Sequence, residues 1–197
     1  MNRYFDSHFN KDIVTIYPGE FYVSTEDELI STVLGSCVSI AIFDQEKKFG
    51  GMNHFILAKD SKMINDYGLA GRFGEYAIEL LITEMVKRGS KRENLVSKIF
   101  GGSNIFGSPN ESQNKVGDVN VRFTYDYLAR EKIPVLASDT GGIEPRKIFF
   151  DPSSAKIWLK RIKNNIHAKT TLLTNEITYI QSVEKDKKKT GGEVVWF

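Results

Sequence analysis

The chain has 197 residues, of which 41% are hydrophobic and 26% charged, and its formal net charge is +2. This length and apolar content suffice for one sizeable core, and the balanced charge gives no indication of nucleic-acid binding. A single cysteine excludes an intramolecular disulfide and a cysteine-rich zinc site, and it fits a reducing compartment. Because no stretch approaches the roughly 20 apolar residues of a membrane span, we expect a cytoplasmic protein that does not insert into membranes.

The N-terminal part predicts a leader followed by short strands. Residues 1–12 are polar and predict a flexible leader, and His8 within them is expected to be solvated. Two short apolar runs, Ile13–Tyr17 and Glu20–Ser24, predict strands that Pro18 and Gly19 separate.

The middle of the chain predicts two helices around a strand. Residues 59–74 are polar and glycine-rich and predict a mobile loop, with a plain surface connection as the alternative. An apolar stripe at helical spacing predicts a helix over Glu75–Arg88. Leu95–Phe100 predicts a strand that runs into two glycines, and Asp118 predicts the N-cap of a second helix that ends near Glu131.

The last third predicts further strands and a tail. Pro134–Ser138 predicts a short buried strand, and Arg146–Phe150 with Lys156–Ile162 predicts a hairpin. Residues 166–184 are rich in β-branched side chains and predict an extra edge strand. Residues 185–197 form a charged linker with an aromatic tip, which either docks on another protein or folds back on this one. Many strands with two helices predict an α+β fold.

The stretch from Ser31 to Leu57 contains the single cysteine, Cys37, and one of the three histidines, His54. Alternating side chains after Cys37 predict a strand, and a polar four-residue loop at Asp44–Lys47 predicts a hairpin. This loop pairs Phe43 with Lys48 and Cys37 with His54, which puts thiol and imidazole on one face.

A lone cysteine in an apolar strand is ordinarily a small core residue, and a lone histidine is ordinarily structural. The preceding Gly35 and Ser36 change this interpretation, because a glycine-serine turn can leave backbone N–H groups near the sulfur. Such N–H groups, at Ser36 and Cys37, could stabilise an oxyanion.

The sequence resembles the chemoreceptor glutamine deamidase family, CheD, over about residues 13–162. The resemblance rests on the strings LGSCVSIAIFD and GGMNHFIL, followed in order by KIFGGSNIF, VGDVNV and IPVLASDTGG. It implies a single deamidase domain over residues 13–165, built as an α/β/β layered sandwich with mostly antiparallel strands and two main helices.

The resemblance also implies roles for individual residues. Cys37 matches the family's nucleophile and His54 its general base. The position of the family's third residue, a threonine, is occupied by Ser31, so Ser31 is expected to orient the imidazole, with the adjacent Thr32 as the alternative. Ile143 stands where the family usually has asparagine.

The implied activity is hydrolysis of glutamine side chains to glutamate in the cytoplasmic helices of methyl-accepting chemotaxis receptors, through a cysteine thioester. The same groups could hydrolyse glutamyl methyl esters, because only the leaving group differs. The family also implies pairing with a CheC-type phosphatase. The alternative is therefore a regulatory binding module that stimulates this phosphatase with little or no catalysis.

Two further functions find less support in the sequence. A toxin-type deamidase would use the same chemistry, but the later motifs follow the chemoreceptor family and no secretion signal is present. A metal site is disfavoured because one cysteine and three scattered histidines give no ligand spacing, and no cofactor is expected.

Overall fold

The computed structural model describes residues 1–56, 68–105, 116–163, 170–172, 174, 176–179 and 181. The elements are, in chain order, β1 (Asn2–Asp6), β2 (Lys11–Thr15), β3 (Phe21–Ser24), β4 (Glu28–Leu34), β5 (Val38–Asp44), β6 (Phe49–Asn53), α1 (Gly68–Lys87), the 3-10 turn η1 (Arg92–Asn94), β7 (Leu95–Gly101), α2 (Val116–Arg130), β8 (Val135–Thr140), β9 (Arg146–Phe150) and β10 (Ile157–Arg161). The described residues between 170 and 181 are helical and are called the C-terminal helical segment.

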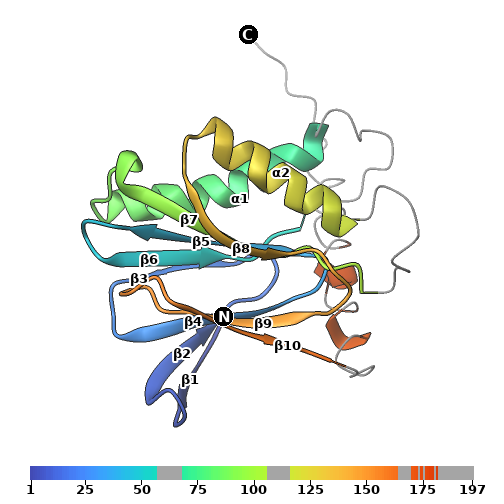
Figure 1. Ribbon diagram of the computed structural model, residues 1–197, viewed down its shortest axis with the longest axis horizontal. Helices are drawn as coiled ribbons and strands as arrows, with labels where there is room; N and C mark the ends of the chain where they lie inside the picture. The colour runs from blue at the N-terminus through green and yellow to red at the C-terminus, as the bar shows by residue number, and fades with distance from the viewer. Residues whose placement is uncertain are drawn as a thin grey trace.

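The strands of the described residues form two five-stranded sheets, in the orders β1-β2-β4-β9-β10 and β3-β6-β5-β7-β8. Neighbouring strands are antiparallel except for the β2–β4 and β7–β8 pairs. Both helices cover one face of the second sheet, and the first sheet lies against its other face (Figure 1). The expected α+β fold, an α/β/β sandwich with mostly antiparallel strands and two main helices, is confirmed.

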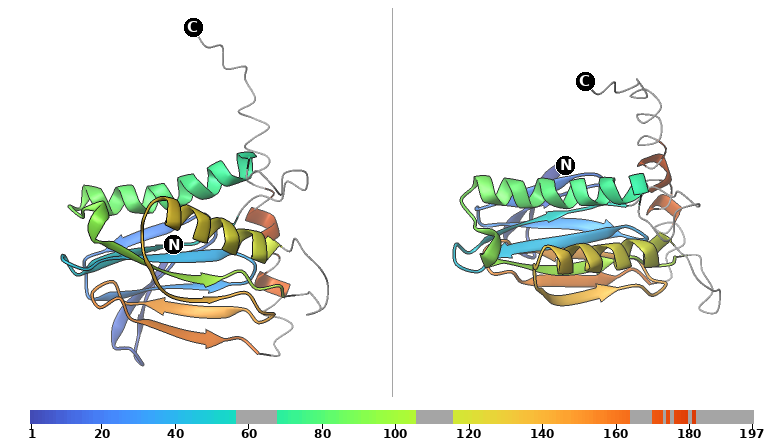
Figure 2. Two further views of the ribbon diagram at one scale, coloured as in Figure 1. Left: turned by 45° about the horizontal axis from the view of Figure 1, so that its top comes forward. Right: turned by 90° about the horizontal axis from the view of Figure 1, so that it is seen from above.

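Strand β5 separates two hydrophobic cores. Its residues Val38, Ile40 and Ile42 face the helices, which lie side by side across the sheet (Figure 2). Its alternate residues Ala41 and Phe43, with Cys37 just before the strand, face the first sheet. All six are buried, because a central strand between two layers has no solvent-exposed face.

The flexible leader predicted for residues 1–12 is wrong. β1 and β2 form an antiparallel pair, and β2 continues in parallel with β4. Arg3 forms a 2.8 Å ion pair with the buried Glu28, and the Phe9 ring packs tilted against Phe149 and edge-on against Trp158. The segment reads as polar because an edge strand keeps much of its surface in water.

Helix α1 begins earlier than its apolar stripe predicts. It starts at Gly68 rather than at Glu75, so the last part of the predicted loop 59–74 is helical, and the rest of that loop lies outside the described residues. Helix α2 spans Val116–Arg130 instead of starting at Asp118. Strand β4 was not predicted, because almost all of its side chains are buried and it shows no alternation.

The strand predicted for residues 166–184 is also wrong, because the described residues of this segment are helical. Thr174 and Thr178 each donate a side-chain hydrogen bond to the carbonyl four residues earlier, at 3.0 and 2.8 Å. Such bonds satisfy the threonine hydroxyls within a helix, and packing against the body of the protein overrides the weak preference of β-branched residues for strands. The linker and aromatic tip predicted for residues 185–197 lie outside the described residues.

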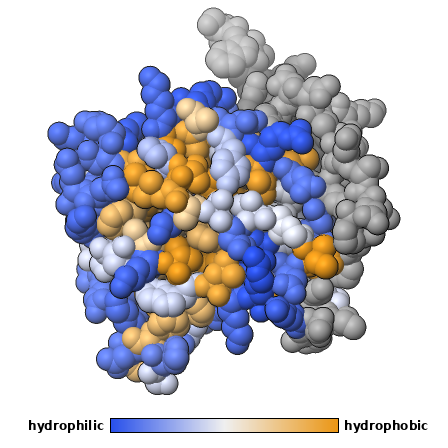
Figure 3. Space-filling view, viewed as in Figure 1, coloured by the Kyte–Doolittle hydropathy of each residue, from blue (hydrophilic) through white to orange (hydrophobic). Residues whose placement is uncertain are grey.

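Hydrophobic side chains gather on the surface where α2 ends and β8 begins (Figure 3). A shallow groove there is lined by Tyr125, Leu128, Ala129, Lys132, Ile133, Pro134 and Val135. None of the residues predicted for catalysis lines this groove. Among the described residues, no helix combines the length and the apolar character needed to span a membrane.

Candidate active site

Cys37 lies in the tight turn that connects β4 to β5. Behind this turn, Gly102 donates its N–H to the Cys37 carbonyl oxygen at 2.7 Å. The side chain of Asn120, on α2, donates to the Ser36 carbonyl oxygen, also at 2.7 Å. The Cys37 N–H is not used by these contacts and donates instead to the Glu176 carboxylate at 3.4 Å.

Two glycines allow β7 to approach this turn closely. Gly101 and Gly102 have positive φ angles of 109° and 69°, as predicted for a backbone shape that other residues resist. A Cβ atom on Gly101 would overlap the Cys37 carbonyl oxygen, and one on Gly102 would overlap Val121. The position of the Cys37 backbone therefore depends on the glycine pair.

His54 follows directly after β6, where its backbone bonds to the turn before β3 rather than to β5. Its N–H donates to the Glu20 carbonyl at 2.9 Å, and its carbonyl accepts from Gly19 at 2.8 Å. On the β5 side, the Asn53 side chain accepts from the Ile40 N–H at 2.9 Å. The backbone of Asn53 and His54 is thus held from two sides, by the turn before β3 and by β5.

Thr32 defines the tautomer of His54. Its hydroxyl lies 2.8 Å from the Ile16 carbonyl oxygen and 2.7 Å from His54 Nδ1. A hydroxyl carries one hydrogen, and a carbonyl can only accept. The Thr32 hydroxyl therefore donates its hydrogen bond to the Ile16 carbonyl oxygen and accepts one from Nδ1–H. Nε2 carries the free lone pair.

The basic nitrogen of His54 is buried and has no hydrogen-bond partner among the described residues. Burial lowers the pKa of His54 from 6.5 to about 3, so the ring is neutral at physiological pH. His54 lines a cavity of about 450 Å³ together with Thr32 and Glu176. An unpartnered base on a ring that lines a cavity can accept a proton from a group that comes within hydrogen-bond reach.

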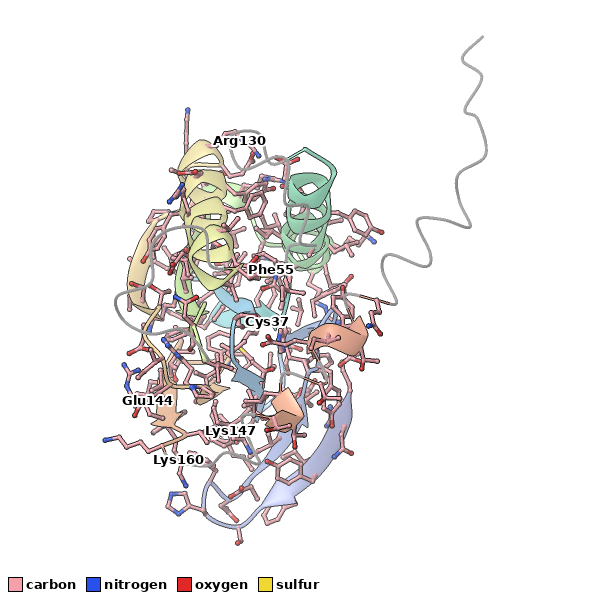
Figure 4. All side chains as sticks on the ribbon, turned by 90° about the vertical axis from the view of Figure 1, so that its right-hand side faces the viewer. Cys37, Phe55, Arg130, Glu144, Lys147 and Lys160 are labelled. Atoms are coloured by element: carbon pink, nitrogen blue, oxygen red, sulfur yellow. The ribbon has the colours of Figure 1, made fainter. Side chains whose placement is uncertain are left out.

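Cys37 is fully buried, on the side of β5 that faces the first sheet. In Figure 4 it lies below the two helices, and the C-terminal helical segment lies beside it. Burial raises the pKa of the Cys37 thiol well above its ordinary value, and the nearby Glu176 carboxylate raises it further. The thiol is therefore protonated in this arrangement.

The family model described as CheD chemotactic sensory transduction matches residues 56–161 of the 197. The chain belongs to the CheD family. A protein of Shewanella oneidensis named probable chemoreceptor glutamine deamidase CheD 1 is 39% identical over all of this chain and 93% of its own length. The similarly named protein of Methylobacillus flagellatus is 39% identical over all of this chain and 95% of its own length. One from Albidiferax ferrireducens is 44% identical over 82% of this chain and 67% of its own length.

The register predicted for the CheD hairpin is shifted by two residues. Phe43 pairs with Gly50 rather than Lys48, and Val38 bridges Phe55, so Cys37 and His54 are not directly opposite. The shift arises because Asp44 belongs to the strand and its carboxylate accepts the N–H groups of the following turn. A shift of two preserves the side-chain face, so His54 is still expected on the Cys37 side of the ribbon.

The structure separates the two hydroxyl candidates for orienting the CheD histidine. Ser31 bonds to the Thr15 hydroxyl at 2.9 Å, whereas Thr32 bonds to His54. Adjacent residues of a strand point to opposite faces, so only one of the two can reach the imidazole. The expectation that Ser31 contacts His54 is corrected in favour of Thr32.

Two residues of the site were not singled out in the sequence. Asn120 is fully buried on α2 beside Phe123 and Thr124, and a polar residue on the inward stripe of that helix was its only signal. Glu176 gave no signal, because its segment was predicted as a strand. Its carboxylate contacts both Ser36 and Cys37.

Proposed function

We propose that this protein hydrolyses glutamine side chains of chemotaxis receptors to glutamate, with Cys37 as nucleophile. The observation that carries the proposal is His54 Nε2, which has no hydrogen-bond partner among the described residues, on a ring that Thr32 orients and that lines a cavity. The names of the CheD relatives support the substrate, because they describe chemoreceptor glutamine deamidases.

In the proposed first step, His54 Nε2 takes the Cys37 thiol proton while the sulfur attacks the carboxamide carbon. The negative charge that develops on the amide oxygen is stabilised by the Cys37 N–H and the Ser36 hydroxyl. This role is supported because both groups already donate to the Glu176 carboxylate, the Ser36 hydroxyl to Oε2 and the Cys37 N–H to Oε1.

Collapse of the tetrahedral intermediate breaks the carbon–nitrogen bond, and His54 returns its proton to the departing ammonia. The product is a γ-glutamyl thioester on Cys37. Water then attacks the thioester with His54 as base, the carbon–sulfur bond breaks, and the thiol is restored as glutamate leaves. A glutamyl methyl ester would follow the same course, with methanol as the leaving group.

The neutral thiol and neutral imidazole imply that the nucleophile is formed during the reaction rather than stored as an ion pair. Burial disfavours charge on both groups. Proton transfer is therefore coupled to attack on the bound amide. No cofactor or metal takes part in the proposed steps.

Mass spectrometry of receptor cytoplasmic fragments tests this proposal. Wild-type protein is expected to convert specific glutamines to glutamate, and Cys37→Ala to convert none. His54→Ala should slow the conversion about 10²–10⁴-fold, the usual contribution of acid–base assistance. Sustained deamidation by Cys37→Ala would rule out the mechanism.

One observation favours the alternative, a regulatory binding module for a CheC-type phosphatase. Cys37 is completely buried, as a residue kept only for packing would be. This alternative predicts binding of the phosphatase without ammonia release from receptor fragments. Binding that persists in Cys37→Ala alongside wild-type catalysis would assign both functions to one chain.

A further inference from the structure

Glu176, on the C-terminal helical segment, binds to the turn that contains the nucleophile. Its Oε2 accepts a hydrogen bond from the Ser36 hydroxyl at 2.5 Å, and its Oε1 accepts from the Cys37 N–H at 3.4 Å. The side chain is almost completely buried, and the segment that carries it lies beside Cys37 (Figure 4).

This position is unusual for a carboxylate. A buried carboxylate is costly unless cations or several donors compensate its charge. No ion pair of Glu176 occurs within the described residues, and the two donors identified above are neutral. A glutamate carboxylate on these donors has the same chemistry as the product of glutamine hydrolysis.

The C-terminal helical segment also packs against the cavity and the turn that make up the site. Thr171, Leu172 and Glu176 form part of the wall of the cavity that contains His54. Tyr179 lies against Gly19, where a Cβ atom would overlap its ring. At Gly35 a Cβ atom would come within 2.7 Å of Glu176 Oε1. The segment therefore packs on the cavity and on the nucleophile turn together.

We propose that Glu176 is a tethered product mimic, which occupies the carboxamide subsite and makes the C-terminal helical segment an internal competitor of the substrate helix. This inference rests on the proposed function. It adds the substrate's binding mode to the proposed function. The site receives a glutamine side chain that a helix presents, along the path that Glu176 takes. The segment must leave before a receptor helix can bind.

The proposed competitor also affects the nucleophile. Its carboxylate raises the pKa of the Cys37 thiol beyond the effect of burial. Departure of the segment removes this charge and opens part of the cover over the sulfur. Substrate access and thiol reactivity should therefore increase together.

The first test compares wild-type protein with Glu176→Ala, and uses Ile177→Ala as the matched control because Ile177 is exposed on the same segment. Removing the mimic should lower KM for a receptor cytoplasmic fragment about tenfold or more, since a tethered ligand competes at an effective concentration in the millimolar range. Alkylation of Cys37, the single cysteine, should accelerate by a similar factor under native conditions. Ile177→Ala should match wild type in both measurements.

These outcomes separate the two proposals. Equal KM and equal alkylation rates in wild type and Glu176→Ala overturn the product mimic, whatever the activity. If Glu176→Ala is alkylated faster but no variant deamidates receptor fragments, Glu176 does shield Cys37, and the proposed function is overturned.

A second test uses the chain as its own substrate. In Glu176→Gln the carboxamide should react with Cys37, release ammonia and leave glutamate at position 176, which peptide mass spectrometry detects. The conversion should be absent from the Glu176→Gln, Cys37→Ala double variant. Glutamine retained at position 176 in a protein that deamidates receptor fragments would contradict the proposed binding mode.

Discussion

Thr32 decides which nitrogen of His54 can act as a base. Its hydroxyl donates a hydrogen bond to the Ile16 carbonyl oxygen and accepts one from Nδ1–H, so the free lone pair is on Nε2. The neighbouring Ser31 has a hydroxyl of similar chemistry but bonds to Thr15. Substitutions at these two adjacent residues therefore compare a hydroxyl that contacts the imidazole with one that does not.

We expect Thr32→Val to reduce kcat for receptor deamidation roughly ten- to a hundredfold. The substitution leaves Nδ1–H buried without an acceptor, at a cost of about 1–3 kcal/mol, and valine keeps the shape of threonine. Thr32→Ser should restore most of the activity. Ser31→Ala should stay within about threefold of wild type, because its effect on the ring is only indirect. A larger loss in Ser31→Ala than in Thr32→Val would contradict the assignment.

The buried His54 also makes stability depend on pH. Its folded pKa of about 3 lies below the ordinary 6.5, so between these values the unfolded chain binds more protons than the folded one. This contribution to stability is complete above pH 6.5 and is lost as the pH falls.

Between pH 7 and pH 5 we expect the free energy of unfolding to drop by about 2 kcal/mol through His54 alone. Urea titrations at several pH values would measure it. His54→Gln should flatten this slope, whereas His8→Gln, at an exposed histidine, should not change it. An unchanged slope in His54→Gln would show that other groups cause the pH dependence.

At the scale of elements, the turn that contains Cys37 is held from behind by its neighbours. Asn120 and Gly102 bind its carbonyls, and Ser103 binds the Gly35 carbonyl at 2.7 Å. Ser103 is in turn hydrogen-bonded by Arg146, which is fully buried at the start of β9 and also binds Asp139. Burial lowers the pKa of Arg146, and Asp139 opposes this effect.

We expect Arg146→Met to lower the free energy of unfolding by roughly 3–5 kcal/mol, because removing one partner leaves buried acceptors without a donor. Arg161 is the matched control, since it binds the other oxygen of Asp139 at 2.6 Å but is largely exposed. Arg161→Met should cost at most about 1 kcal/mol. Chemical denaturation of both variants measures the difference, and similar losses would contradict the role of burial.

At the scale of the whole molecule, segments far apart in sequence complete one site. The turn that contains Cys37, His54 after β6, α2 and the C-terminal helical segment meet at one end of the sandwich (Figures 1 and 4). The N-terminal hairpin extends the first sheet on its β2 side. Arg3 at this edge compensates the buried charge of Glu28.

Deleting residues 2–6 should therefore destabilise the folded protein, by about 1–3 kcal/mol for the lost partner of Glu28 alone. Arg3→Gln in the full chain isolates the ion-pair contribution from that of the strand. Thermal unfolding of both proteins measures the losses. A deletion without effect would restore the interpretation of residues 1–12 as a leader.

Much of this site could be predicted from local patterns. The alternation after Cys37 predicted strand β5 and its two faces, and a register error of two residues does not change the face on which His54 is expected. The glycine pair after β7 predicted a special backbone, and both glycines have positive φ. These features could be predicted because the alternation of a strand has a period of two residues, and the special backbone depends on a single residue type, glycine.

The sequence by itself determined the α+β fold and the family motifs, and it predicted a thiol and an imidazole on one face of a hairpin. Only the tertiary structure decided that Thr32 rather than Ser31 meets the imidazole, that Asn120 holds the turn containing Cys37, and that Glu176 contacts this turn. The choice between Ser31 and Thr32 follows from which face of β4 packs against His54. The Cys37–Glu176 contact joins residues 139 positions apart, and no local pattern carries information about a contact that forms only when the layers pack.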